Sequence, residues 1–193
     1  MCCLFGFIDY NHNLSGKQKN RLLRSLASAA EERGTDAAGI AYHAGGRLHI
    51  MKKAKPAHVL RFRIPLETSV VMGHTRYATQ GDAKKAYNAH PFQGQIGGKK
   101  FALAHNGVLL NDRLLQRAED LPKTHIGTDS YVAVRLLEKQ NALNFNSLRK
   151  VAEQVQGIEG AGAFRKKSHQ AGLLSVRVLT SSTLISSTSA ISS

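Results

Sequence analysis

Cys2 carries the most distinctive chemistry in the sequence, because it directly follows Met1. A thiolate is a good nucleophile, but a free cysteine thiol has a pKa of about 8.5 and needs a nearby base to ionise at neutral pH. A small side chain at position 2 permits removal of Met1, which would leave Cys2 with an unblocked α-amine. That amine, with a reference pKa near ~7.7 to 8, can take the thiol proton and later pass it to a leaving group. We expect Cys2 to supply both nucleophile and base.

The chain has only two cysteines, Cys2 and Cys3, and because they are adjacent they cannot cross-link distant parts of a fold. The alternative is that both are small buried hydrophobic side chains. No apolar run approaches the ~20 residues that span a bilayer, and the first residues lack the basic segment and cleavage pattern of a secretory signal. We therefore predict a cytoplasmic protein with free thiols and no membrane segment.

Three other polar segments contain residues that suit an amino-acid substrate. Arg76 lies in GHTRYAT, Asn106 and Gly107 lie in AHNG, and Asp129 lies in TDS. The planar guanidinium of Arg76 can bind an α-carboxylate, and Asp129 can pair with an α-ammonium. Each also has a structural alternative: a surface salt bridge for Arg76, a helix cap for Asp129, and a tight turn for Asn106–Gly107. Together, the cation and the anion favour an α-amino acid.

These segments, with Cys2, RGTDAAG at 33–39 and NAHP at 88–91, follow one another in the order found in class II glutamine amidotransferases. Over roughly residues 2–157 the chain resembles the glutaminase domains attached to glucosamine-6-phosphate synthase and to glutamine phosphoribosylpyrophosphate amidotransferase. The resemblance implies an α+β fold, the four-layer αββα sandwich of N-terminal-nucleophile hydrolases. It also implies hydrolysis of the L-glutamine side-chain amide to glutamate and ammonia through a Cys2 thioester.

The resemblance also implies roles for individual side chains. The groups expected to act on the amide are Cys2 as nucleophile, with the Asn106 side-chain amide and the Gly107 N–H as donors to the developing oxyanion. The residues expected to bind the substrate are Arg76, Tyr77, Thr79, His90 and Asp129, with Tyr77 as a pocket wall and His90 at the pocket edge. Arg33 is expected near the nucleophile, and its alternative is a cation that offsets the dipole at a helix end.

Hydrophobic periodicity and turn signals indicate the elements that must hold these residues. The expected strands are CCLFGFIDY, AAGIAYHA and RLHIMKKA around Gly45–Gly46, SVVMGHTRYAT, and FALAHNGVLL with a break at 105–107. The expected helices run from a Ser15–Gln18 capping box to Arg33 with Gly34 as the stop, from Asp112 to Glu119, from Ser130 to Lys139 with Thr128 or Asp129 as cap, and from Asn146 or Ser147 to Gly157. A long polar loop covers 79–92. This order is typical of stacked sheets covered by helices.

Residues 158–193 differ in character from the rest of the chain. They are rich in Gly and Ala, then basic, then rich in Ser and Thr. The apolar strands with which the family continues cannot be recognised there. We therefore expect a glutaminase domain at 2–157 and an atypical tail at 158–193, which is either disordered or supplies strands through LLSVRVLTSSTLISS. A second departure from the family is Cys3, where Gly is common, and we expect it to be tolerated.

The chain has 27 Lys and Arg against 13 Asp and Glu, and the resulting net charge of +14 favours anionic partners. The basic residues are spread out, without aromatic interleaving or a nucleic-acid motif, so specific nucleic-acid binding is not expected. The nine histidines show no HxH or HExxH spacing, and there is no phosphate-binding glycine loop. We expect neither a metal nor a cofactor.

Two other functions are open on this evidence. One is an amidohydrolase that cleaves a different amide with the same terminal cysteine. The other is an inactive amidotransferase-like domain that binds or regulates, with anionic partners favoured by the charge. No synthase or phosphoribosyltransferase domain is expected to follow residue 193, so ammonia made here would need a separate acceptor protein or would be released.

Overall fold

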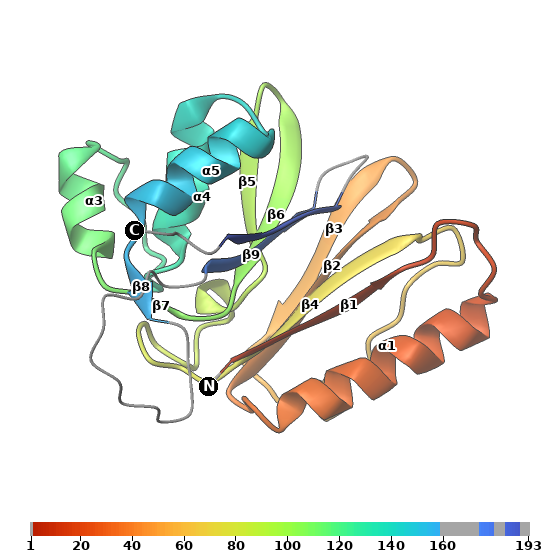
Figure 1. Cartoon of the computed structure of the whole chain (residues 1–193). Helices are drawn as coiled ribbons and strands as arrows, with labels where there is room; N and C mark the ends of the chain where they lie inside the picture. The colour runs from red at the N-terminus through yellow and green to blue at the C-terminus, as the bar shows by residue number, and fades with distance from the viewer. Residues whose placement is uncertain (1, 159–173, 180–183, 190–193) are drawn as a thin grey trace.

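The computed structural model describes residues 2–158, 174–179 and 184–189, with side chains as far as Gly157. Two four-stranded antiparallel sheets lie face to face with helices on their outer sides, and a short β7–β8 pair lies at one end (Figure 1). The strands are β1 Cys3–Ile8, β2 Ala37–Ala44, β3 Arg47–Lys53, β4 Val70–Arg76, β5 Phe92–Ile96, β6 Lys99–His105, β7 Val108–Leu109, β8 Gly157–Ile158, β9 Leu174–Leu179 and β10 Leu184–Ser189. The helices are α1 Gly16–Glu31, α2 Ala57–Leu60, the 3-10 turn η1 Ala86–Asn88, α3 Asp112–Ala118, α4 Tyr131–Gln140 and α5 Phe145–Gln154.

The first sheet has the strand order β1-β4-β2-β3 and is covered by α1. This helix begins where the sequence predicts, because the Ser15 hydroxyl accepts the Gln18 N–H while the Gln18 side chain accepts the Ser15 N–H. Its apolar face, which includes Leu23, packs in one cluster with Phe5 of β1 and Ile40 of β2. The outer face of the first sheet is therefore a buried core.

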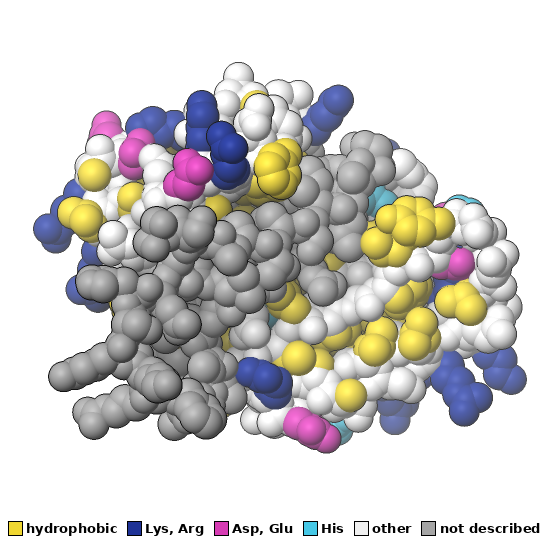
Figure 2. Space-filling model, in the orientation of Figure 1, with side chains coloured by type: hydrophobic (Ala, Val, Ile, Leu, Met, Phe, Trp, Pro, Cys, Tyr) yellow, Lys and Arg dark blue, Asp and Glu magenta, His cyan; other side chains and the backbone are white. Residues whose placement is uncertain are grey.

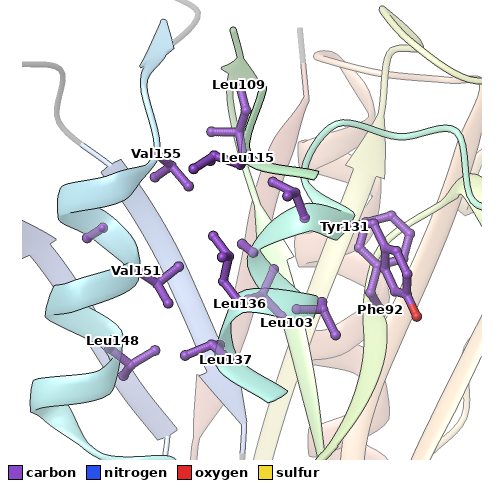
Figure 3. Packing of buried hydrophobic residues seen from close by; sticks show 14 of the residues in the cluster. Phe92, Leu103, Leu109, Leu115, Tyr131, Leu136, Leu137, Leu148, Val151 and Val155 are labelled. Carbon is purple, nitrogen blue, oxygen red and sulfur yellow. The ribbon is translucent and has the colours of Figure 1, made fainter. Parts of the chain in front are cut away.

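The second sheet has the order β10-β9-β6-β5, and α4 and α5 pack on its outer face (Figure 3). Leu136 of α4, Val151 of α5 and Leu103 of β6 belong to one buried cluster. At its edge, the rings of Phe92 and Tyr131 meet in a T-shaped contact with centroids 5.4 Å apart. This cluster fixes the start of α4 against β5.

Between the two sheets lies a third apolar cluster. Ala41 and Met72 from the first sheet pack with Ala102 and Ala104 from the second, and all four are buried. Inner faces of two sheets that pack in this way form the core of a sandwich. The layers are helix, sheet, sheet and helix, which confirms the predicted α+β sandwich of four layers.

The predicted turns between strands are also confirmed. Gly45 and Gly46 join β2 to β3 with φ values of 55° and 70°, which is the backbone that a two-residue hairpin of this type requires. The break predicted at 105–107 is present but shorter, at Asn106 and Gly107, because His105 is still part of β6; Gly107 has a φ of 153°. The chain therefore changes direction immediately after His105.

The predicted caps of α4 are wrong. Its N-cap is Ser130 rather than Thr128 or Asp129, and the Ser130 side chain makes no capping hydrogen bond. The reason is that the Asp129 carboxylate is used elsewhere, as acceptor of the Leu109 N–H at 2.5 Å. A residue type that usually caps a helix here connects two different segments.

The predicted start of α5 is late by one or two residues. The helix begins at Phe145, because Asn144 accepts the Ser147 N–H and Ser147 in turn accepts the Asn144 N–H. The short helix α2 follows Pro56 and was not predicted. Four residues are too few to show helical periodicity in a sequence.

The tail is described in part. β8 pairs with β7, β9 pairs with β6 in the register Leu103↔Val178, and β10 pairs with β9. The domain boundary at 157 stays a prediction. Expectations for 159–173, 180–183 and 190–193 lie outside the described residues.

A buried ion pair ties the β1–α1 turn to the loop before β4. Lys19 is 0% exposed, and its Nζ lies 3.1 Å from Asp9 Oδ2 and donates to the carbonyls of Leu66 and Thr68, both at 2.8 Å. Burial alone would raise the pKa of Asp9, but the hydrogen bond from Lys19 and nearby backbone N–H groups lower it below its usual value. The pair therefore stabilises the fold at neutral pH, and this contribution is lost in acid.

Removing the lysine should destabilise the protein strongly. Lys19→Met removes the charged partner of Asp9, which keeps only the N–H groups of Asn13 and Leu14, and it removes the side-chain donor to two carbonyls, so we expect the melting temperature to fall by roughly 5–10 °C. Circular dichroism melting measures the change. Lys17→Met is the matched control, because Lys17 is exposed on the same helix. Equal melting temperatures for the two variants would contradict the assigned role of the ion pair.

Candidate active site

Cys2 lies immediately before β1, against the end of β4. Its Sγ is 3.4 Å from the Tyr77 nitrogen and 3.5 Å from the Tyr77 carbonyl oxygen. Cys3 instead packs against the core under α1, because successive side chains of a strand point to opposite faces. Of the two thiols, only Cys2 faces the end of β4.

The Cys2 thiol is half-buried, and this affects its ionisation. Burial raises the pKa of the thiol, while its hydrogen bond with the Tyr77 backbone and the positive charge of Arg76 act in the opposite direction. The negative charge of Asp129 raises it further. The protein environment by itself therefore favours the thiol over the thiolate, and a base is needed to make it a nucleophile.

Arg76 is the last residue of β4 and is only 2% exposed. Its Nη2 donates to the carbonyl oxygens of Gln80 and Gly81. Its Nη1 is buried and has no hydrogen-bond partner among the residues that the structure describes. One edge of the guanidinium is thus anchored by the following loop, and the other has donor capacity to spare.

The RGTD segment after α1 supports the backbone around Arg76. α1 ends at Glu31 rather than at Arg33, and Gly34 is not its stop. A Cβ on Gly34 would lie 2.5 Å from the Arg76 carbonyl carbon, so only glycine allows this approach. Arg33 itself is exposed.

Asp36 was not among the predicted site residues, although it belongs to the same motif. Its N–H donates to the Arg76 carbonyl at 3.0 Å, and its Oδ2 accepts the Ala78 N–H at 2.8 Å. Asp36 thereby holds both sides of Tyr77, the residue whose backbone contacts Cys2. Its presence in the motif was the signal that could have revealed it.

Asp129 is buried beside β7. Its Oδ2 accepts the Leu109 N–H at 2.5 Å, and burial raises its pKa, with the N–H groups of Leu109 and Ser130 acting in the opposite direction. Its charge acts on Cys2 and on Arg76, which brings the three side chains into one electrostatic environment. The start of β1 and the β7–β8 pair lie at the same end of the molecule (Figure 1).

Asn106 and Gly107, the predicted oxyanion donors, lie in the break between β6 and β7, three and two residues before Leu109. Both are half-buried. Within the described ranges the Asn106 side-chain amide makes no hydrogen bond, so its N–H groups are not committed to holding the fold. The turn interpretation and the oxyanion interpretation are therefore compatible in this structure.

The NAHP segment is hydrogen-bonded to the residues that directly precede Asp129. Asn88 Oδ1 accepts the Gly127 N–H at 2.8 Å, and the Thr128 hydroxyl donates to the Asn88 carbonyl at 2.7 Å. Lys52 Nζ donates to the carbonyls of Ala89 at 2.6 Å and Pro91 at 3.0 Å. Sequence reasoning did not single out Lys52, because nothing near it in the chain indicates a partner almost forty residues away.

The remaining predicted substrate-binding residues differ in their exposure to solvent. Tyr77 is 55% exposed and Thr79 is also exposed, so both can form part of an open wall. His90 is 3% exposed, and its ring packs at tilted angles between those of His74 and Phe92, with both centroid distances 4.3 Å. His90 therefore lies beneath the surface rather than at an open edge, and its role in substrate binding stays a prediction.

A cavity of about 320 Å³ adjoins Asp129. It lies between Gln80, the basic side of α3 with Arg113 and Arg117, and the segment from Thr124 to Val132. Its volume is in the range of small-molecule sites. Asp129 forms part of the wall of this cavity.

Comparison with known proteins identifies the family. The profile of the family described as glutamine amidotransferases class-II matches residues 1–164. The chain belongs to this family, as predicted. It is 39% identical over 145 residues to a glutamine–fructose-6-phosphate aminotransferase (isomerizing) of Bacillus cereus, covering 72% of this chain and 22% of that protein. The corresponding protein of Caldanaerobacter subterraneus is 32% identical over 172 residues, covering 86% and 27%.

Solved structures share the fold. A structure entitled allosteric regulatory enzyme of purine biosynthesis covers 97% of this chain and 37% of its own, with a TM-score of 0.71 and 18% identity. A glutamine phosphoribosylpyrophosphate amidotransferase of B. subtilis gives a TM-score of 0.66 at 18% identity, covering 97% and 36%. Both support the N-terminal-nucleophile type of sandwich. The present chain spans only about a quarter or less of the relatives' length.

Two features are absent from the part of the chain that the structure describes. No group of three or more His, Cys, Asp or Glu side chains there could hold a metal ion. None of the helices there has the length and apolarity of a membrane span. On the face shown in Figure 2, Lys and Arg side chains lie in separate groups rather than in one continuous patch.

Three buried histidines next to the site should make the fold sensitive to acid. Burial lowers the pKa of His74 to about 3, of His105 to about 4, and of His90 well below its usual value. The unfolded chain therefore binds more protons than the folded one below pH ~6.5, so the stability of the fold decreases as the pH is lowered. We expect the free energy of unfolding to fall by on the order of 1 kcal/mol per pH unit for each of them.

Urea unfolding between about pH 6.5 and 5, above the range of most carboxylates, measures this slope. His74→Leu should make the slope shallower. His12→Asn should not, because His12 is exposed. A stability that is constant over this window would show that the buried histidines can take up protons in the folded state.

Proposed function

We propose that the chain hydrolyses L-glutamine to glutamate and ammonia with Cys2 as the nucleophile. The observation that carries the proposal is the contact of the Cys2 thiol with the backbone of Tyr77, directly after a buried arginine that has an uncommitted nitrogen. Asp129 acts electrostatically on both Cys2 and Arg76. A nucleophile, a cation and an anion at one end of the sandwich match the amide, carboxylate and ammonium of glutamine.

The first half of the reaction makes a thioester. After removal of Met1, the α-amine of Cys2 takes the thiol proton, directly or through water, as Sγ bonds to the side-chain amide carbon of glutamine. The amide oxygen becomes an oxyanion, which the Asn106 side chain and the Gly107 N–H stabilise. The carbon–nitrogen bond then breaks, and the α-ammonium returns its proton to the departing ammonia.

The second half releases glutamate. Water attacks the thioester carbon while the α-amine takes its proton, a second tetrahedral intermediate forms, and the bond to Sγ breaks. The proton returns to the thiolate, which restores the starting state. The raised pKa of the Cys2 thiol supports a role for this base, because few thiols would otherwise be ionised.

Recognition of glutamine depends on two buried charges. Arg76 offers its second edge to the α-carboxylate, with Thr79 assisting, and Asp129 pairs with the α-ammonium. Both side chains are already shielded from water, so a zwitterion of complementary spacing would gain more from them than from exposed groups. An amide without the α-amino acid group lacks both contacts.

The other predicted residues have supporting roles in this proposal. Tyr77 forms an exposed wall, and Arg33 helps to hold the terminal segment next to Gly34. His90 acts through packing beneath the pocket, since it is buried against His74.

Delivery of the ammonia to an acceptor belongs to the same proposal. The relatives are named for transfer of nitrogen to fructose 6-phosphate, and the matched region is 22% of the Bacillus cereus protein. A cytoplasmic location belongs to the same proposal and is supported by two free thiols, which persist in a reducing compartment.

Replacing the nucleophile tests the proposal directly. Cys2→Ala should have no glutaminase activity, and 6-diazo-5-oxo-norleucine should label Cys2 of the unmodified protein after loss of Met1, as read by intact mass spectrometry and peptide mapping. Cys3→Ala is the matched control, because Cys3 points into the core under α1 and should retain most activity at some cost in stability. Equal loss in both variants would contradict the choice of nucleophile.

Removing the oxyanion donor should slow the chemical step. Asn106→Ala is expected to lower kcat for glutamine by about 10²- to 10³-fold with little change in KM, because the donor acts mainly in the transition state. Steady-state release of ammonia measures both constants. Asn146→Ala, an exposed position on α5, serves as the control. An unchanged kcat in Asn106→Ala would leave the break at 106–107 as a turn only.

A further inference from the structure

The N-cap serine of α4 has an unusual use. A serine at this position normally accepts an N–H from the first turn of its helix, as Ser15 does for α1. Ser130 makes no such bond, although it is only 1% exposed. Its hydroxyl lies 2.9 Å from His105 Nδ1 and donates to Asp129 Oδ1 at 3.4 Å. The side chain is directed toward the site rather than toward its own helix.

His105, Ser130 and Asp129 are linked by hydrogen bonds, and the number of protons available to each side chain limits which group donates. The Ser130 hydroxyl has one proton, and its bond to Asp129 uses it. With the Ser130 proton directed at Asp129, we assign His105 the tautomer that donates from Nδ1 to the Ser130 oxygen. Burial lowers the pKa of His105 to about 4, so the ring is neutral near pH 7 and carries only this one N–H.

The backbone of His105 is fixed as well. Its carbonyl oxygen is 3.1 Å from His74 Nε2, and both residues are buried. Because a carbonyl oxygen can only accept, His74 donates from Nε2 in this hydrogen bond. His105 is therefore held by its main chain and is able to orient Ser130 with its ring.

These hydrogen bonds fix the position of the Asp129 carboxylate. The Leu109 N–H fixes one oxygen of the carboxylate, and Ser130 fixes the other. A carboxylate held at both oxygens is restrained from rotating about its Cβ–Cγ bond. Its unused lone pairs therefore keep a fixed orientation relative to the site. That orientation matters only for a ligand group that Asp129 binds.

We propose that Ser130 and His105 are positioning residues that orient the Asp129 carboxylate toward the α-ammonium of the amino-acid substrate. The inference rests on the proposed function of this site. It adds two residues that sequence reasoning did not assign, and it gives them a role in substrate affinity rather than in the chemical step.

The test compares Ser130→Ala with Ser130→Thr in the full chain. Ser130→Ala should raise KM for glutamine about tenfold while kcat changes by less than about threefold, because one hydrogen bond to a charged group is lost. Ser130→Thr keeps the hydroxyl and should restore KM. Alkylation of Cys2 by iodoacetamide, which needs no ammonium contact, should proceed at the same rate in all three proteins.

Ser15→Ala is the matched control, because it removes an N-cap hydroxyl that does cap its helix. It should lower the melting temperature and leave KM unchanged. Should Ser130→Ala fail to fold, His105→Asn and His105→Leu decide instead: Asn keeps a donor near the Nδ1 position and should hold KM, whereas Leu should raise it.

An unchanged KM in Ser130→Ala, or a threonine variant as impaired as the alanine variant, would overturn the inference. A wild-type protein that turns over glutamine normally alongside such a result leaves the proposed function intact. A correctly processed wild-type protein that does not hydrolyse glutamine contradicts the proposed function itself.

Discussion

The burial of two opposite charges at one end of the sandwich constrains everything around the site. A charged side chain removed from water destabilises a fold unless hydrogen bonds and dipoles compensate it. Around Arg76 the compensation comes from the carbonyls of Gln80 and Gly81, and around Asp129 from the Leu109 N–H. The guanidinium is not saturated, since Arg76 Nη1 lacks a partner in the described part of the chain. An incompletely compensated pair of charges is well suited to a zwitterionic ligand.

The segments that provide this compensation come from distant parts of the chain, and close backbone contacts hold them together. Gly34 allows the turn after α1 to lie on the Arg76 backbone, and a Cβ on Gly39 would lie 2.3 Å from the His90 carbonyl oxygen. The side chains of Asp36 and Asn88 each accept a further hydrogen bond from a backbone N–H group. Such contacts tolerate little change, so the motifs that contain these residues combine chemistry with packing.

The buried histidines give the interior of the sandwich polarity without charge. His74 and His105 donate or accept hydrogen bonds next to the site while burial keeps them neutral. Apolar residues there could not orient Ser130, and charged residues would add to the charges already buried. The arrangement has a cost in acid, because each imidazole gains affinity for protons when the chain unfolds. The buried histidines thus hold side chains in place around the site and lower the stability of the fold at low pH.

The sequence by itself determined the elements and the family. The Ser15–Gln18 capping box, the Gly45–Gly46 hairpin and the break at Asn106–Gly107 are local signals, and local hydrogen bonding or backbone geometry decides each of them. The order of motifs from Cys2 to Asp129 was enough to predict the four-layer sandwich. Helix ends were less predictable, because a side chain such as Asp129 can bond to a remote N–H instead of capping its own helix.

Only the tertiary structure decided which of these residues meet. Strand alternation separates Cys2 from Cys3, and the contact with Tyr77 across 75 positions cannot be read from spacing. The burial of His90 and the direction of the Ser130 hydroxyl depend on how α4 packs against β5 and β6. A sequence pattern records residue types along one chain, whereas hydrogen bonds and desolvation depend on neighbours that folding brings from elsewhere.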